Sequence, residues 1–239
     1  MSGKNRQNFV LSVVLLVFSI QGVPAEEPRF LAQRIDGPVP WYGPFSEGSA
    51  VFDVDRDGNL DITAGPYWYK GPDFKRLPLR DCPSTRIEFI ENLGEFPYDL
   101  NGDGWTDLIS ASWFNNGIYW YENTKNDGSL WPRHKIADSL GTEALIVEDL
   151  DGNGIPDILP NHYRPQEVFW IEILPGPEFK RHIIGSQGSR HGLGLGDVNG
   201  DGRKDVITMD GWYEAPEQPR RGVWQWHPEW NNPGAGGIR

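Results

Sequence analysis

Four nine-residue stretches of this chain carry aspartate or asparagine at alternate positions and glycine at the sixth. They span 53–61, 99–107, 149–157 and 197–205, and each fits D-x-[DN]-x-[DN]-G-x-x-D. Side-chain oxygens at positions 1, 3 and 5 can point to one centre. The glycine allows a sharp reversal that turns the backbone carbonyl of position 7 inward. A ligand set made only of oxygens is the chemistry that calcium prefers.

Position 9 of each stretch is a further aspartate, directly before a predicted strand. An EF-hand loop instead places glutamate at position 12, on a helix. The pattern therefore predicts calcium loops within β-hairpins, holding up to four ions. The predicted side-chain ligands are Asp53, Asp55, Asp57, Asp61, Asp99, Asn101, Asp103, Asp107, Asp149, Asp151, Asn153, Asp157, Asp197, Asn199, Asp201 and Asp205. The predicted backbone-carbonyl ligands are Asn59, Trp105, Ile155 and Arg203.

The alternative to metal binding is a polar turn, because Asp, Asn and Gly are turn residues. Four matches in register favour metal. Magnesium suits the loops less well because it prefers a rigid octahedron and keeps its waters. Zinc suits them poorly because no loop contains His or Cys. The loops hold 13 of the 34 acidic residues in a chain of formal charge −12. This acidity argues against nucleic acid or an anionic membrane as partner.

The loops recur at a period that indicates a repeat fold. Their first aspartates are 46, 50 and 48 residues apart. Short apolar runs flank each loop, and an aromatic strand and a fourth strand follow. Four strands in about 48 residues predict an all-β fold, a β-propeller of four-stranded blades. A β-solenoid is the alternative, but its repeat is far shorter. The predicted blades are 45–81, 91–138, 142–185 and 190–230.

Residues 1–25 have the pattern of a secretory signal peptide: basic residues, then an apolar run over 9–20, then Val23-Pro24-Ala25. The alternative is an uncleaved anchor. We expect residues 26–239 to be secreted or periplasmic, with no membrane contact after cleavage. Segment 29–36 reads as the outer strand of a blade that lacks its other strands. The chain is therefore predicted to be a partial propeller of about four blades.

The loops and their period resemble the FG-GAP/VCBS repeat family, which includes the calcium-bearing blades of integrin α-subunits. The resemblance covers roughly residues 29–230 and implies a fragment of a seven-bladed ring. The stretches His191-Gly-Leu-Gly-Leu-Gly-Asp197 and Trp224-Gln-Trp-His-Pro-Glu-Trp230 also resemble a bacterial subgroup similar to the propeller part of aldos-2-ulose dehydratase. That second resemblance maps no catalytic residue. With the single Cys82 no internal disulfide can form, so calcium is the expected staple.

The residue six positions before each loop is predicted near the start of an inner strand, close to the propeller axis. These residues are Glu47, Leu93, Glu143 and His191. The three ionisable ones are candidate acid–base catalysts or ligands of a second metal, and His162 and Asp210 could join them. The alternative is that inner-strand ends of propellers are polar because they are wet, and Leu93 breaks the pattern.

The 11 tryptophans allow two interpretations. Trp68, Trp120, Trp170 and Trp212 recur at one strand position, which favours packing between blades. Tryptophans near predicted loops could instead stack on sugar rings; these are Trp113, Trp131, Trp212 and Trp230. Two functions follow: a secreted calcium-binding module for glycans or proteins, or the propeller part of a carbohydrate-active lyase or dehydratase. The fold alone does not choose between them.

Overall fold

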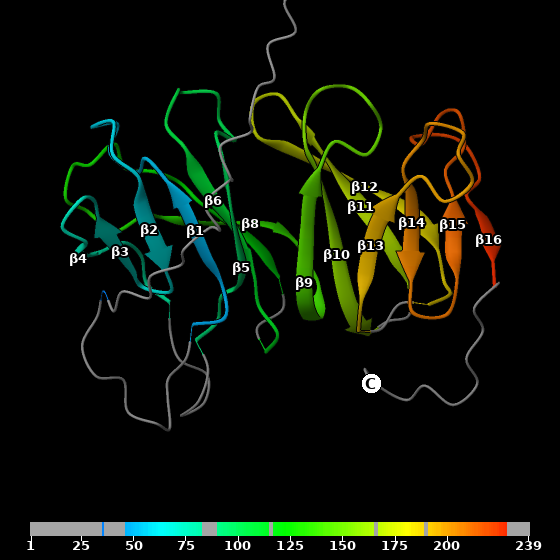
Figure 1. Cartoon of the computed structure of the whole chain (residues 1–239), viewed down its shortest axis with the longest axis horizontal. Coiled ribbons are helices and arrows are strands. Elements are labelled where there is room, and N and C mark those ends of the chain that lie inside the picture. The colour runs from blue at the N-terminus through cyan, green and yellow to red at the C-terminus, as the bar shows by residue number, and fades with distance from the viewer. Residues whose placement is uncertain are drawn as a thin grey trace, which may run out of the picture. The chain divides into compact units, whose positions relative to one another are not determined.

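The computed structural model describes residues 35, 46–82, 90–114, 117–164, 167–188 and 191–228, the side chains of residues 140 and 162–164 excepted. The predicted signal peptide, most of segment 29–36 and Trp230 lie outside these residues. The described chain folds into four antiparallel sheets of four strands each and contains no helix (Figure 1). It therefore holds no helix with the length and hydropathy needed to cross a bilayer. The predicted all-β fold of propeller-type blades is confirmed.

Each sheet is built from consecutive strands in chain order. The first contains β1 (Ser49–Phe52), β2 (Asp61–Ala64), β3 (Tyr67–Lys70) and β4 (Lys75–Pro78). The second contains β5 (Leu93–Tyr98), β6 (Asp107–Ala111), β7 (Ile118–Tyr121) and β8 (Arg133–Ala137). The third contains β9 (Leu140–Glu148), β10 (Asp157–Arg164), β11 (Val168–Leu174) and β12 (Glu178–Gly185). The fourth contains β13 (Leu193–Gly196), β14 (Asp205–Thr208), β15 (Trp212–Glu214) and β16 (Gln225–His227).

Each acidic stretch joins the first strand of a sheet to the second as a hairpin loop. The strand residue before the loop pairs directly with position 9, as in Phe52 with Asp61 and Gly196 with Asp205. The glycine at position 6 has φ between +85° and +88° in all four loops. Residues other than glycine rarely adopt this left-handed conformation, which explains the glycine in the pattern.

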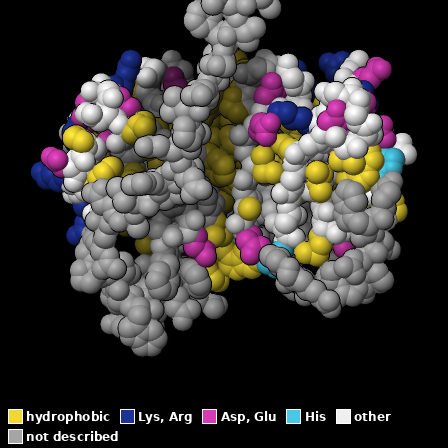
Figure 2. All heavy atoms as spheres, viewed as in Figure 1, with side chains coloured by type: hydrophobic (Ala, Val, Ile, Leu, Met, Phe, Trp, Pro, Cys, Tyr) yellow, Lys and Arg dark blue, Asp and Glu magenta, His cyan; other side chains and the backbone are white. Residues whose placement is uncertain are grey.

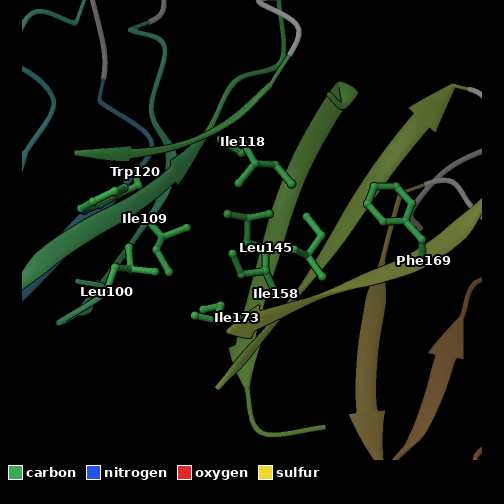
Figure 3. Packing of buried hydrophobic residues seen from close by; sticks show 10 residues of the cluster. Leu100, Ile109, Ile118, Trp120, Leu145, Ile158, Phe169 and Ile173 are labelled. Carbon is green, nitrogen blue, oxygen red and sulfur yellow. The ribbon is translucent and has the colours of Figure 1, made fainter. Parts of the chain in front are cut away.

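Apolar side chains join neighbouring sheets through three clusters. One cluster packs apolar residues of the second sheet against those of the third (Figure 3): Leu100, Ile109, Ile118 and Trp120 against Leu145, Ile158, Phe169 and Ile173. The other two clusters join the first sheet to the second and the third to the fourth. The repeated tryptophans Trp68, Trp120, Trp170 and Trp212 are all at most 6% exposed. The predicted packing between sheets is confirmed for the first three, which lie in these clusters.

Trp131 does not provide a stacking surface at a loop. Its side chain is buried in the cluster between the first and second sheets, and its backbone N–H donates to the carbonyl of Leu79 at 2.8 Å. The interpretation of Trp131 as an exposed loop aromatic is therefore wrong.

Cys82 is a buried free thiol, as expected, and burial raises its pKa to about 11. It thus behaves as a small core residue.

A histidine on the fourth strand packs against the repeated tryptophan in three sheets, at ring-centroid distances of 4.2–4.5 Å; the rings are stacked in the third and fourth sheets and tilted by 32° in the second. The same histidine bonds the glutamate two residues after that tryptophan. The three sets are Trp120, Glu122 and His134; Trp170, Glu172 and His182; and Trp212, Glu214 and His227. These contacts tie the third strand to the fourth through side chains as well as the backbone.

Candidate functional site

In all four acidic loops the backbone N–H groups of positions 5 and 6 donate to the aspartate at position 1, and in three of them the N–H of position 4 does so too, as at 197–205. The Asp197 carboxylate accepts the backbone N–H groups of Gly200, Asp201 and Gly202 at 2.7, 3.0 and 2.8 Å. In each loop, likewise, the position-5 side-chain oxygen accepts the N–H of position 7 at 2.6–2.9 Å. Positions 1 and 5 therefore shape the loop as well as supplying oxygens.

The aspartate at position 9 is at most 1% exposed in every loop. One oxygen accepts the N–H of position 2 at 2.8–3.0 Å. In three loops the other oxygen accepts an N–H just after the third strand, from Gly71, Asn123 or Ala215. Burial raises the pKa of Asp107 to about 6 and that of Asp157 to about 7. This carboxylate therefore holds the hairpin to the third strand, a role that the sequence pattern did not indicate.

Two of the loops bring three carboxylates together. Within Asp53, Asp55 and Asp61, and within Asp149, Asp151 and Asp157, one oxygen of each residue lies within 4.8 Å of the others. Asp55 Oδ1 and Asp157 Oδ1 are buried and accept no hydrogen bond. Because buried carboxylate oxygens without partners are costly, these two loops fit a hard divalent cation. A calcium ion bound there would offset the repulsion among the three carboxylates of each loop.

The other two loops have a different internal arrangement. Position 3 is asparagine in both, and its Nδ2 donates to the position-5 carboxylate. Asn101 donates to Asp103 at 3.3 Å and Asn199 to Asp201 at 2.9 Å. No three-carboxylate group of the described residues falls in these loops. The loops at 53–61 and 149–157 are therefore the better candidates for a metal.

Basic side chains reach both of these loops. Lys70 Nζ pairs with the carboxylates of Asp55 and Asp57, the second at 2.8 Å. Arg220 Nε lies 2.7 Å from Asp151 Oδ2 and 2.7 Å from Glu172 Oε1. Arg220 belongs to the segment before β16, so this contact also joins the fourth sheet to the third. The cations partly balance the acidic clusters.

A pocket forms where the first strands of the four sheets begin. The four residues that the sequence placed six positions before each loop all line it: Glu47, Leu93, Glu143 and His191. Gly94, Trp113 and Phe114 also line this first-strand pocket, whose volume is about 350 Å³. Asp210 is not among these residues, and the side chain of His162 is not described. The acidic loops lie at the other end of the same strands (Figure 1).

Two of the ionisable groups that line the pocket form a hydrogen-bonded pair, and the third lies near this pair. His191 Nδ1 is hydrogen-bonded to Glu143 Oε2. Burial and, next, the charge of Glu143 raise the pKa of Glu47. The Trp113 ring stacks on the His191 ring with centroids 5.9 Å apart and planes 14° apart. The pocket therefore combines two carboxylates and an imidazole with an aromatic wall.

The aromatic wall comes from the turn after β6. Trp113 and Phe114 directly follow the second strand, which runs back toward the start of β5, since Leu93 pairs with Ala111. The sequence predicted Trp113 as a loop aromatic, whereas Phe114 was not predicted. The usable signal was position: residues that end a second strand lie beside those that begin a first strand.

A buried network supports the pocket from behind. Asn92 Nδ2 donates to Ser46 Oγ, Gly48 O and Glu95 Oε1 at 2.8, 2.9 and 2.9 Å. These bonds hold the segment that carries Glu47 against β5. Glu95 in turn pairs with Arg80, and both side chains are 0% exposed.

A comparison with known protein families matches part of the repeated sequence. Residues 99–159 match the model of the FG-GAP-like repeat, from the second acidic loop to β10. The chain contains an FG-GAP-like repeat. The resemblance drawn from the loop spacing is therefore confirmed for these residues. No curated protein matches the chain significantly.

One similar solved structure is a lectin of Agrocybe aegerita, described for specific recognition of non-reducing terminal N-acetylglucosamine. It shares 18% identity with this chain at a TM-score of 0.50. The match covers 77% of this chain and 54% of the lectin, so the chain spans about half of the lectin's length. At this identity the likeness concerns the fold. The seven-bladed ring and the dehydratase resemblance stay predictions.

Proposed function

We propose that this protein is a secreted, calcium-binding β-propeller module that binds glycans through the first-strand pocket. The observation that carries the proposal is the convergence of Glu47, Glu143, His191 and Trp113 in one cavity. Sugars need hydrogen-bonding groups for their hydroxyls and a flat aromatic surface for their C–H faces. The similarity of the fold to a glycan-recognising lectin supports the same function.

A glycan array tests this proposal. Wild type should bind a defined set of glycans, and Trp113→Ala should weaken binding about five- to tenfold, since loss of an aromatic contact costs about 1–1.4 kcal/mol. Tyr67→Ala is the matched control, because Tyr67 is an exposed aromatic outside the pocket. The proposal fails if no glycan binds, or if both variants bind as the wild type does.

Calcium is proposed as the staple of the sheets. The proposal rests on the FG-GAP-like repeat, the two three-carboxylate loops and their unpartnered buried oxygens. One site filled at 100 times its Kd stabilises a fold by about 2.7 kcal/mol. For a chain of this size that corresponds to a shift of about 5–10 °C in melting temperature.

The calcium test compares melting with EDTA and with calcium. Calcium should raise the melting temperature of wild type and of Asp127→Asn, whose aspartate lies in an exposed turn outside the loops. Asp149→Asn should lose a large part of that gain. An unchanged melting temperature on chelation would show that the loops are polar turns.

Secretion is proposed from the pattern of residues 1–25. The expected result in a secretion-competent host is a mature chain beginning near Glu26 in the medium or periplasm. N-terminal sequencing or intact mass checks this. An intact N-terminus in the membrane fraction would instead indicate an anchor.

One observation favours a second candidate function, a carbohydrate lyase or dehydratase. The hydrogen-bonded His191 and Glu143 lie beside Glu47, whose pKa is raised, which is an arrangement suited to proton transfer. A bound glycan that is converted to an unsaturated product, with conversion lost in His191→Ala, would establish this function. A glycan recovered unchanged after long incubation would exclude it for that glycan.

A further inference from the structure

We infer that the first-strand pocket selects sugars that carry a free, protonated amine over their N-acetylated and hydroxyl counterparts. This inference rests on the proposed glycan-binding function and names the ligand class of that site. It follows from the charges, the donor–acceptor balance and the aromatic wall of the pocket.

The charged groups of the pocket are predominantly acidic. Among the described residues that line it, the ionisable ones are Glu47, Glu143 and His191, and none is Lys or Arg. His191 is engaged with Glu143. The charge that acts on Glu47 is the like charge of Glu143, which helps to raise the pKa of Glu47. A cation placed between the two carboxylates would relieve this repulsion, whereas a neutral sugar would not.

The hydrogen-bonding groups favour a ligand that donates. An ionised carboxylate only accepts hydrogen bonds, and an ammonium group only donates them, with three N–H groups. An N-acetyl group offers one N–H and requires a donor for its carbonyl oxygen. Among the side chains of the described lining residues, only the rings of His191 and Trp113 carry N–H groups. The pocket therefore suits an ammonium group better than an acetamide.

The aromatic wall favours the same ligand. Trp113 lies parallel to the His191 ring, and Phe114 is 39% exposed. A cation held over an aromatic face is attracted to the electron-rich face of the ring, and tryptophan provides the best such face. Acidic, histidine and hydrophobic side chains gather at the lower edge of the described surface in Figure 2, so one amphipathic ring could meet all three.

The experiment titrates three disaccharides that differ in one substituent: the β-1,4-linked dimers of glucosamine, N-acetylglucosamine and glucose. Isothermal titration at about pH 6.5 keeps an amine with a pKa near 7.7 protonated. We expect the glucosamine dimer to bind at least about tenfold more tightly than the other two. Glu47→Gln and Glu143→Gln should each reduce that preference about threefold or more. Trp113→Ala should weaken all three ligands.

Glu148→Gln is the matched control, because Glu148 is an exposed acid on the same strand as Glu143 but at the loop end. It should keep the wild-type preference. If the glucose or N-acetylglucosamine dimer binds as tightly as the amine, the inference is wrong while the proposed glycan-binding function stands. If none of the three binds but other glycans on the array do, the inference is also wrong. If no glycan binds at all, both fail.

Discussion

The buried pair of Arg80 and Glu95 provides a sharp test of how the first and second sheets are joined. Glu95 on β5 accepts hydrogen bonds from Thr63 Oγ1 at 2.5 Å, from Gly65 N at 3.1 Å and from Asn92 Nδ2 at 2.9 Å, besides its pairing with Arg80. Thr63 and Gly65 belong to the first sheet and its turn. One carboxylate therefore collects donors from two sheets.

Glu95→Gln replaces one carboxylate oxygen by an NH₂ group that faces these donors, and it leaves the Arg80 guanidinium as an unpaired charge that is 0% exposed. Breaking a buried ion pair in this way costs about 3–5 kcal/mol. In a chain of this size, each kcal/mol lowers the melting temperature by about 2–4 °C. The expected decrease is thus on the order of 6–20 °C. Arg80→Met combined with Glu95→Gln should recover part of the loss, because it removes the unpaired charge.

Urea unfolding measured with and without the substitution gives the free energy directly. Glu167→Gln is the control, since Glu167 pairs with Arg181 in a partly exposed ion pair. Such pairs contribute at most about 1 kcal/mol. If Glu95→Gln costs no more than this control, the buried network does not join the sheets and the reasoning is refuted.

Three other predictions concern backbone strain, close packing and pH. At position 4 of the loops, Arg56 has φ +62° and Gly102 has φ +72°. A residue with an L side chain is destabilised by about 1–2 kcal/mol in this left-handed conformation. Gly102→Ala should therefore destabilise the fold in urea unfolding, whereas Arg56→Gly should be neutral or stabilising. Gly48→Ala should cost about 1–3 kcal/mol in the same assay and weaken ligand binding, since its Cβ would lie 2.6 Å from the backbone of the neighbouring strand; an unchanged stability would contradict this packing. Asp157 has a pKa raised to about 7, so its proton stabilises the metal-free fold fully below about pH 4, and this contribution is lost as pH rises through about 7. The stability of wild type relative to Asp157→Asn in EDTA should therefore fall across this window, and a pH-independent difference would contradict the shift.

Most of the fold could be predicted from the acidic loops and their spacing in the sequence. Their alternation and fixed period predicted hairpins within four-stranded sheets, because glycine at position 6 and aspartate at position 9 are local requirements of one turn. The alignment of Glu47, Glu143 and His191 was predicted in the same way. Residues at the same distance before equivalent loops must lie at the same end of equivalent strands.

The contacts between sheets could not be predicted from the sequence pattern. Arg80 and Glu95 do not share a repeat position, and their pairing follows from how the first two sheets pack. Trp131 was misplaced for the same reason, since a neighbouring sheet covers it. The histidines that pack against tryptophan, by contrast, have a recognisable sequence pattern: Trp-x-Glu on a third strand with histidine on the fourth, at 120–134, 170–182 and 212–227.

Hydrogen–deuterium exchange by mass spectrometry tests the central claim, that metal and glycan bind at opposite ends of the same strands. Calcium should slow exchange in peptides that cover 53–61 and 149–157, and should do so less at the first-strand pocket. The best glycan ligand should slow exchange around 92–94, 113–114, 142–144 and 191–193, and leave the loops unchanged. Protection of the acidic loops by the glycan, or of the pocket alone by calcium, would contradict the account.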